Sequence, residues 1–76
     1  MEKLNKMIKE HSKFVSCYTY DREDEVITFI HTRNYFQYVV QIYNENFYRA
    51  EVFDDLTGEE MGVKYLTIEN FKKLLK

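Results

Sequence analysis

Residues 25–53 read EVITFIHTRNYFQYVVQIYNENFYRAEVF, and this stretch decides the fold. It is rich in Val, Ile, Thr, Tyr and Phe, which are the residue types that fit a pleated, half-buried surface. Two short polar breaks interrupt it, Arg33-Asn34 and Asn44-Glu45-Asn46. The sequence therefore predicts three consecutive antiparallel strands. Their expected bounds are Glu25–Thr32, Tyr35–Tyr43 and Phe47–Phe53.

The alternation of side chains fixes the pairing of the first two of these strands. The pairs expected across the first break are His31 with Phe36, Phe29 with Tyr38, and Ile27 with Val40. This row of side chains is mostly apolar, whereas the opposite row mixes apolar and polar residues. Because a sheet buries its more apolar face, we expect the first row, continued by Ile42, to lie under the helices.

A three-residue loop at the second break continues the same apolar face. It pairs Ile42 with Tyr48, Val40 with Ala50, and Tyr38 with Val52. A two-residue loop would instead bring Arg49 onto the buried face, where an unpaired charge is costly. We therefore expect the three-residue loop, with Asn46 in the left-handed conformation that Asn tolerates.

The residues before this region predict a helix and a further strand. In residues 1–13, apolar or aromatic side chains recur at a helical spacing, and four Lys lie mainly on the other sides. Phe14–Tyr20 alternates as a strand does, and Asp21-Arg22-Glu23-Asp24 forms a charged turn after it. With a four-residue loop, Tyr18 is expected to face Ile27, and Phe14 to face His31.

The residues after this region predict a hairpin and a second helix. Gly58 suits a turn that needs positive φ, Leu56 is expected to cap the core, and Met61–Leu66 is expected to return as a fifth strand. Thr67 is the expected N-cap of the last helix, with Leu66 and Phe71 placed for a hydrophobic staple. The apolar stripe of this helix consists of Ile68, Phe71, Leu74 and Leu75.

Together these patterns predict one small α+β domain spanning residues 1–76. The expected architecture is an antiparallel meander of four to five strands, with an N-terminal and a C-terminal helix packed on one face. Domains of this length bury only roughly 60% of the surface that the unfolded chain exposes, but six Phe and seven Tyr can still build a core.

Composition indicates the cellular location of the protein more clearly than its chemical activity. One cysteine excludes an internal disulfide, and no apolar run approaches the roughly 20 residues that span a bilayer, so we expect a cytoplasmic protein without membrane contact.

Charge is unevenly distributed along the chain. Residues 1–13 have four Lys against two Glu, residues 67–76 have three Lys against one Glu, and residues 14–66 have four basic against ten acidic residues.

No catalytic, metal or cofactor pattern emerges from the sequence. His11, His31 and Cys17 are not spaced as metal ligands, and a lone strand Cys is usually a small hydrophobic residue. The acidic runs at 21–25 and 54–60 do not follow a calcium-binding loop, and we interpret them as solvated turns. We interpret the lysine-bearing sides of the helices in the same way, with nucleic-acid contact as the alternative.

The face of the sheet opposite the helices is the candidate for function. Aromatic side chains, Arg and amides are mixed there, a composition typical of protein interfaces. The residues predicted to bind a partner are Tyr35, Gln37, Tyr43, Phe47, Arg49 and Phe53. The alternative is that the tyrosines are simply half-exposed and that Arg49 pairs with a neighbour such as Glu51.

The leading hypothesis is a small non-enzymatic protein-binding module, acting as an inhibitor, adaptor or accessory subunit through this face and the acidic loops. A sharper version is a phage or mobile-element protein that inhibits a host nuclease, which fits a composition poor in Ala and typical of AT-rich coding sequences. The remaining alternatives are nucleic-acid binding through the helix lysines and an enzyme. A homodimer through sheet faces or edges is compatible with each of them.

Overall fold

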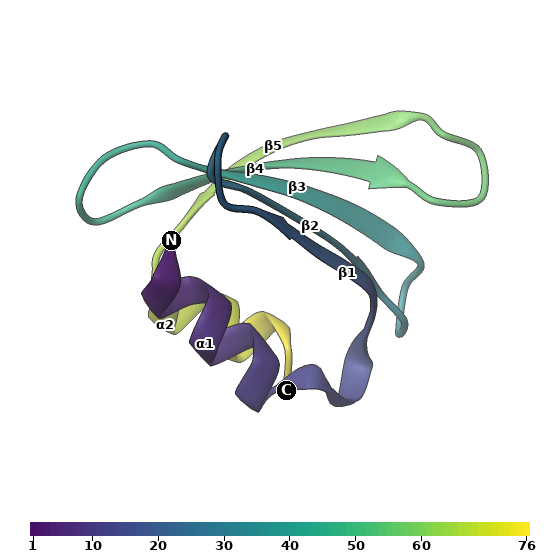
Figure 1. Ribbon diagram of the computed structural model, residues 1–76. Coiled ribbons are helices and arrows are strands. Elements are labelled where there is room, and N and C mark those ends of the chain that lie inside the picture. Colours follow the sequence, from purple (N-terminus) through teal and green to yellow (C-terminus); the bar gives the residue numbers. More distant parts are fainter.

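Two helices lie side by side on one face of a five-stranded antiparallel sheet in the computed structural model (Figure 1). The structure describes residues 1–76 apart from the side chain of Ser12. The elements, in chain order, are α1 (Glu2–Glu10), a 3-10 helix η1 (Ser12–Phe14), β1 (Val15–Asp21), β2 (Val26–His31), β3 (Phe36–Ile42), β4 (Tyr48–Asp54), β5 (Glu60–Leu66) and α2 (Ile68–Leu74). The strands neighbour one another in the same order, so the predicted α+β meander between two terminal helices is confirmed.

The pairing predicted for the three central strands is confirmed. In β2 and β3, Phe29 lies opposite Tyr38 and Ile27 opposite Val40. In β3 and β4, Val40 lies opposite Ala50, as the three-residue loop requires. Side-chain alternation was sufficient to predict this pairing, because a shift by one residue would exchange the two faces of the strand.

The prediction that Asn46 adopts the left-handed conformation in the β3–β4 loop is wrong, since its φ is not positive. Asn44 shapes the loop instead. Its side-chain oxygen accepts hydrogen bonds from the backbone N–H of Asn46 and of Phe47, each at 2.9 Å. A side chain that bonds the backbone two residues on closes such a turn without left-handed geometry.

The pairing predicted for the first strand is wrong because the β1–β2 turn comprises residues 22–25 rather than 21–24, and because β1 contains a bulge. His31 lies opposite Val15 rather than Phe14, and Ile27 lies opposite Tyr20 rather than Tyr18. The register shifts between Ser16 and Thr19, where Cys17 has φ 51°. An extra residue in one strand breaks strict alternation, and no residue type in the sequence marks its place.

The strands β1 to β4 each begin one residue later than the sequence predicts, and a left-handed residue precedes two of them. Glu25 and Tyr35 were expected at the starts of strands, but each is the last residue of a turn and has a left-handed φ, 53° and 59° respectively. In the second turn the side chain of Asn34 accepts a hydrogen bond from the backbone N–H of Phe36 at 3.0 Å. Non-glycine residues adopt this conformation at a cost, so sequence propensity does not predict it.

A single core fills the space between the sheet and the helices. Its fully buried side chains include Leu4, Ile8, Ile27, Phe29, Tyr38, Val40, Ala50 and Phe71. The rings of Phe29 and Tyr38 stack with centroids 5.2 Å apart. Two sequence expectations fail, because Ile42 is 45% exposed and Leu56, the expected cap of the core, is 78% exposed. Each lies near the end of a hairpin, beyond the helices.

Both helices have identifiable ends. The first is shorter than the predicted 1–13, and the ring of His11, just after it, bonds the carbonyl of Met7 at 2.9 Å. The predicted N-cap of α2 is confirmed, since the hydroxyl of Thr67 accepts a hydrogen bond from the backbone N–H of Asn70 at 3.1 Å. The side chain of Asn70 in turn accepts from the backbone of Thr67, which completes a capping box.

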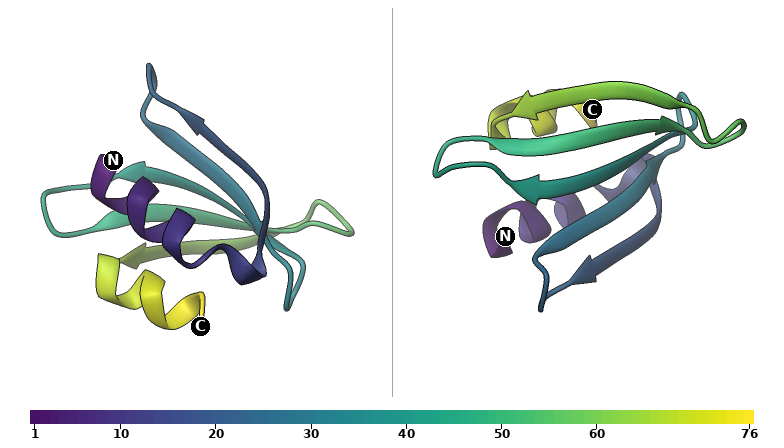
Figure 2. Two further views of the ribbon diagram at one scale, coloured as in Figure 1. Left: turned by 60° about the horizontal axis from the view of Figure 1, so that its bottom comes forward. Right: turned by 90° about the horizontal axis from the view of Figure 1, so that it is seen from above.

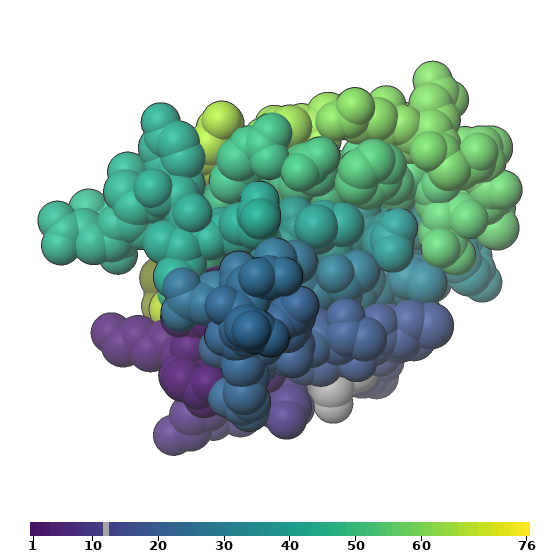
Figure 3. Space-filling view, turned by 45° about the horizontal axis from the view of Figure 1, so that its top comes forward, coloured from purple at the N-terminus to yellow at the C-terminus, as the bar shows by residue number. Residues whose placement is uncertain are grey.

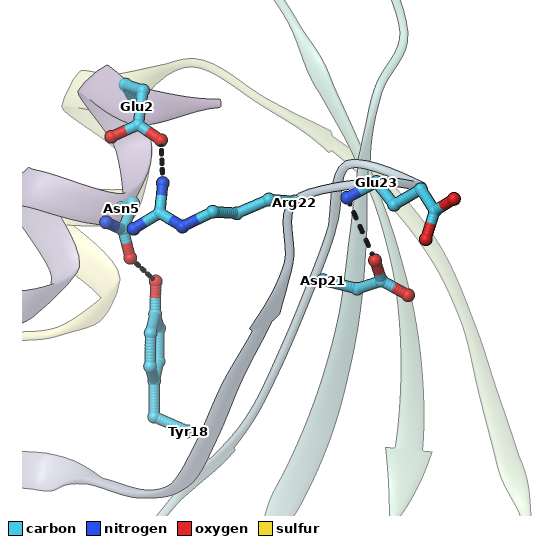
Figure 4. Close-up of polar contacts among 6 residues, drawn as sticks. All are labelled: Glu2, Asn5, Tyr18, Asp21, Arg22 and Glu23. Atoms are coloured by element: carbon cyan, nitrogen blue, oxygen red, sulfur yellow. Dashed lines mark hydrogen bonds and ion pairs between the residues drawn. The ribbon is translucent and has the colours of Figure 1, made fainter.

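Polar contacts join α1 to the first hairpin (Figure 4). Buried Asn5 accepts a hydrogen bond from the hydroxyl of Tyr18 on β1, and Glu2 pairs with Arg22 in the β1–β2 turn. These contacts hold α1 beneath β1 and β2, while α2 follows directly from β5. The sheet is strongly twisted, and both helices lie on the same side of it in each view (Figure 2). Its other side has no helix over it.

Candidate functional site

We call the side of the sheet that faces away from the helices the outer face. Its side chains form three rows across neighbouring strands, defined by the register of the strands. The rows are Gln41–Arg49–Tyr65, then Thr28–Val39–Glu51–Val63, and then Ile30–Gln37–Phe53, with Glu60 opposite Phe53 at the β5 edge. The outer face therefore has apolar or aromatic groups in every row and one pair of charged residues near its middle.

Two tyrosines form an exposed aromatic pair at one end of the outer face. Tyr43 follows β3 and is 60% exposed, whereas Tyr65 lies on β5 and is 50% exposed. Their ring centroids are 4.7 Å apart and the rings meet edge to face. Each ring restricts the other, so the pair offers a large contact area with little conformational freedom to lose on binding.

The two charged side chains near the middle of the outer face neutralise each other. Arg49 donates a hydrogen bond to the carboxylate of Glu51 at 3.0 Å, within the same strand. Glu51, and after it the hydroxyl of Tyr65, raises the pKa of the Arg49 guanidinium above its ordinary value. A partner that covers this pair does not leave either charge without a counterpart, so the energetic cost of covering it is reduced.

The structure brings four of the six predicted partner-binding residues onto one surface and leaves two aside. Gln37, Tyr43, Arg49 and Phe53 belong to the outer face or its margin. Tyr35 instead lies in the β2–β3 turn, where its carbonyl accepts a hydrogen bond from the backbone of Asp55 at 2.8 Å.

Phe47, the sixth predicted residue, lies in the loop at the opposite end of the sheet. It lines a groove with Tyr48, Thr67 and Ile68, beside the start of α2. Four residues of the predicted set therefore share one surface, and one outlying residue lies at each end of the sheet.

Strand β5 supplies three residues that the sequence analysis did not assign to this surface. Met61, Val63 and Tyr65 alternate along it, and their exposed fractions are 51%, 37% and 50%. The signal was available in the sequence, because MGVKYL alternates with the same period of two as the central strands. The sequence analysis missed this alternation because it located the strand only from the turn before it.

Acidic loops surround the outer face, and lysines lie in the helix layer. Figure 3 shows the side away from the helices, where β3 to β5 (teal to green) form a broad surface and the helix layer (purple) appears only at the lower margin. The acidic residues in the turns and loops, and at the strand ends that adjoin them, are Asp21, Glu23, Asp24, Glu25, Glu45, Asp54, Asp55, Glu59 and Glu60. The outer face thus has an apolar centre with a negative rim.

Buried His31 has no hydrogen-bond partner among the described side chains and backbone groups. It is 3% exposed, and both ring nitrogens are unpaired. The ring of Phe14 lies 6.4 Å from it, and the Arg33 guanidinium lies 4.1 Å from the centre of the Phe14 ring. An imidazole enclosed in this way is part of the core, and it keeps the cost of unmet hydrogen bonds at both ring nitrogens.

The other residues considered as metal ligands or as a nucleophile do not form a site among the described residues. Within the described residues, no three His, Cys, Asp or Glu side chains cluster in a way that could hold a metal ion. Cys17 lies exposed at the bulge in β1. None of the described helices has the length and apolar character needed to cross a membrane.

Comparisons with protein-family models, with curated proteins and with solved structures found no match to this chain. Its function is therefore argued from the geometry of its own surfaces.

Proposed function

We propose that this chain is a small, non-enzymatic protein-binding module that holds its partner on the outer face. The observation that carries this proposal is the exposed aromatic and aliphatic surface formed by Tyr43, Tyr65, Val63 and Met61 on the side away from the helices. Contiguous apolar surface of this kind on a small domain is typical of interaction sites. Binding would cover it without disturbing the core.

The distribution of charge indicates what kind of protein fits. The rim of acidic loops favours a partner with Lys or Arg around an apolar centre, because oppositely charged rims speed association and exclude wrong partners. The paired Arg49 and Glu51 contribute little net charge at the centre. An inhibitor, adaptor or accessory subunit that covers a basic surface fits this arrangement.

Nucleic-acid binding through the helices has weaker support. The groove between α1 and α2 is lined by Lys3, Lys6 and Lys72, but also by Glu10 and Glu69. Lys72 already pairs with Glu69 at 3.4 Å. Phosphate binding needs several free cations on one surface, whereas this groove alternates in sign.

The experiment compares partner capture by the wild-type chain and by two variants that each lose an exposed apolar side chain. Tyr65→Ser removes one ring of the aromatic pair. Leu56→Ser is the matched control, because Leu56 is more exposed but lies in the β4–β5 loop, off the outer face. Each immobilised chain is incubated with lysate of the source organism, and bound proteins are quantified by mass spectrometry.

We expect one or more basic proteins to be retained by the wild type and by Leu56→Ser, and to be depleted with Tyr65→Ser. Retention should fall as salt rises, since the rim attraction is screened. Identical capture profiles for the wild type and Tyr65→Ser, with both chains folded by circular dichroism, would contradict the proposal.

A further inference from the structure

We propose that, in the free protein, a second copy of this chain covers the outer face, so that self-association and partner binding compete for one surface. This inference rests on the outer face being a binding surface, as proposed above, and it names a second occupant. Four observations carry it: the state of the sheet edges, the paired charges, the dimensions of the face and the sign of its rim.

The two edge strands of the sheet have features that prevent pairing with a strand of another chain. Strand β1 has a bulge at Cys17, and β5 has another opposite Val52 and Phe53, where Gly62 has φ 124°. Lys64, on the helix side of β5, is exposed at this edge. Bulges and charged residues on edge strands prevent edge-to-edge extension, so two copies would meet through a face.

The centre of the outer face can lose water without stranding a charge. Arg49 and Glu51 remain paired, and Tyr65 adds to the contacts that stabilise the guanidinium. The side chains around them are Val39, Val63 and Phe53, which gain from burial. The helix layer lacks such a surface, because its apolar side chains are already in the core.

The dimensions of the face suit a dimer. Five strands spaced about 4.8 Å apart and about seven residues long at about 3.3 Å each give a surface of about 24 Å by 23 Å. With side-chain relief, this approaches the roughly 800 Å² per partner of a standard interface. The face is also compatible with its own copy. A twofold axis between the row that contains Arg49 and the row that contains Glu51 would exchange these rows, so that Arg49 of one copy meets Glu51 of the other.

The acidic rim makes this dimer weaker than the complex with a basic partner. In a dimer the loops that contain Glu59 and Glu60 would meet like charges of the second copy, whereas a basic partner would meet opposite charges. Self-association should therefore strengthen as salt rises, and partner binding should weaken. The two occupants share the apolar centre and differ in the sign of the rim interaction.

The experiment is sedimentation equilibrium of the purified chain, over a concentration series, at two ionic strengths. Salt of about 0.1 M and about 1 M gives Debye lengths of about 10 Å and 3 Å, and we expect the dimer to tighten about tenfold between them. Val63→Lys should leave a monomer at both, because it would place an extra charge in the apolar part of the covered surface. Leu56→Ser should behave as the wild type.

Two further variants keep the test decisive. Glu59→Gln combined with Glu60→Gln should tighten the dimer at low salt and remove most of its salt response, which separates rim repulsion from a general effect of salt on apolar contacts. If Val63→Lys fails to fold by circular dichroism, Tyr43→Ser takes its place and should weaken the dimer about tenfold, a loss typical of an exposed aromatic anchor.

Three results would overturn the proposal: a monomer up to the solubility limit at both ionic strengths, a dimer that none of the outer-face substitutions weakens, or a dimer that loosens as salt rises. None of them bears on whether a different protein binds the outer face, which the capture experiment with Tyr65→Ser decides separately.

Discussion

Both faces of the central strands contain aliphatic and aromatic side chains, but the outer face mixes them with amide and charged side chains, and helices cover only the other face. Val40 points to the helices and is fully buried, whereas its neighbour Val39 points to the outer face and is only half-buried. The helix-covered face is closed by Phe71 and Leu75 from α2 and by Leu4 from α1. The difference teaches that an apolar row in a strand predicts burial only where a second layer exists to cover it.

The largest expected difference between the two faces comes from removing an aromatic ring. Phe71→Ala should lower the free energy of unfolding by about 3–5 kcal/mol, because the ring is fully buried and its loss leaves a cavity. Tyr65→Ala on the outer face should cost less than about 1 kcal/mol in the monomer, since half of that side chain is already in water. Urea denaturation followed by circular dichroism measures both. Equal losses would show that the outer face is part of the core.

A matched pair of valines gives a sharper test within one strand. Val40→Ala should cost about 2 kcal/mol, the scale of a fully buried aliphatic side chain, whereas Val39→Ala should cost well under half of that. Both substitutions lower strand propensity in the same way, so the propensity effect cancels in the comparison. Chemical denaturation of the two variants checks it. A cost for Val39→Ala as large as that for Val40→Ala would indicate that a partner copy covers the outer face under the conditions used.

His31 is a buried polar side chain on the helix-covered face of the sheet, which is otherwise mostly apolar. His31→Leu should raise the free energy of unfolding by about 1 kcal/mol, because it removes two buried nitrogens that lack partners while keeping a side chain of similar bulk. Thermal and urea denaturation near neutral pH measure the change. The matched control is His11→Leu, whose ring bonds the carbonyl of Met7 and should therefore lose stability. A clear loss with His31→Leu would reveal a hydrogen bond to His31 through ordered water.

The smallest expected effect concerns pH and the contact between α1 and β1. Burial, followed by the neighbouring Tyr20, raises the pKa of Tyr18 to about 12, against 10.0 for an ordinary tyrosine. The neutral phenol is thus favoured by the fold. Its contribution is fully present below pH 10 and is lost as pH rises toward 12.

Tyr18→Phe should therefore flatten the loss of stability in this alkaline range, relative to the wild type. Denaturation midpoints measured between neutral pH and the alkaline limit test this. Because the ring is only partly buried, the effect should be modest. An unchanged alkaline slope in the variant would assign the pH dependence to Tyr20, Tyr38 or Tyr48, whose pKa values burial also raises.

Much of the candidate surface was predictable because it follows from alternation. Once the row containing Tyr38 and Val40 is assigned to the core, the row containing Gln37 and Val39 must face the other way. Arg49 and Phe53 were assigned on that basis, and the structure places them on the outer face. Tyr35 and Phe47 were placed there by extending the same alternation beyond the ends of the strands. A left-handed residue and a loop end the alternation at those two points.

The sequence by itself determined the order of the elements, the pairing of β2 with β3 and of β3 with β4, and the capping of α2 at Thr67. These features depend on neighbours in the chain and on a period of two, which residue types reveal directly. Only the tertiary structure decided the bulge at Cys17, the exposure of Ile42 and the surface that Tyr65 forms with Tyr43. Those depend on how far the helices extend over a twisted sheet and on contacts between distant strands, and local sequence carries no record of either.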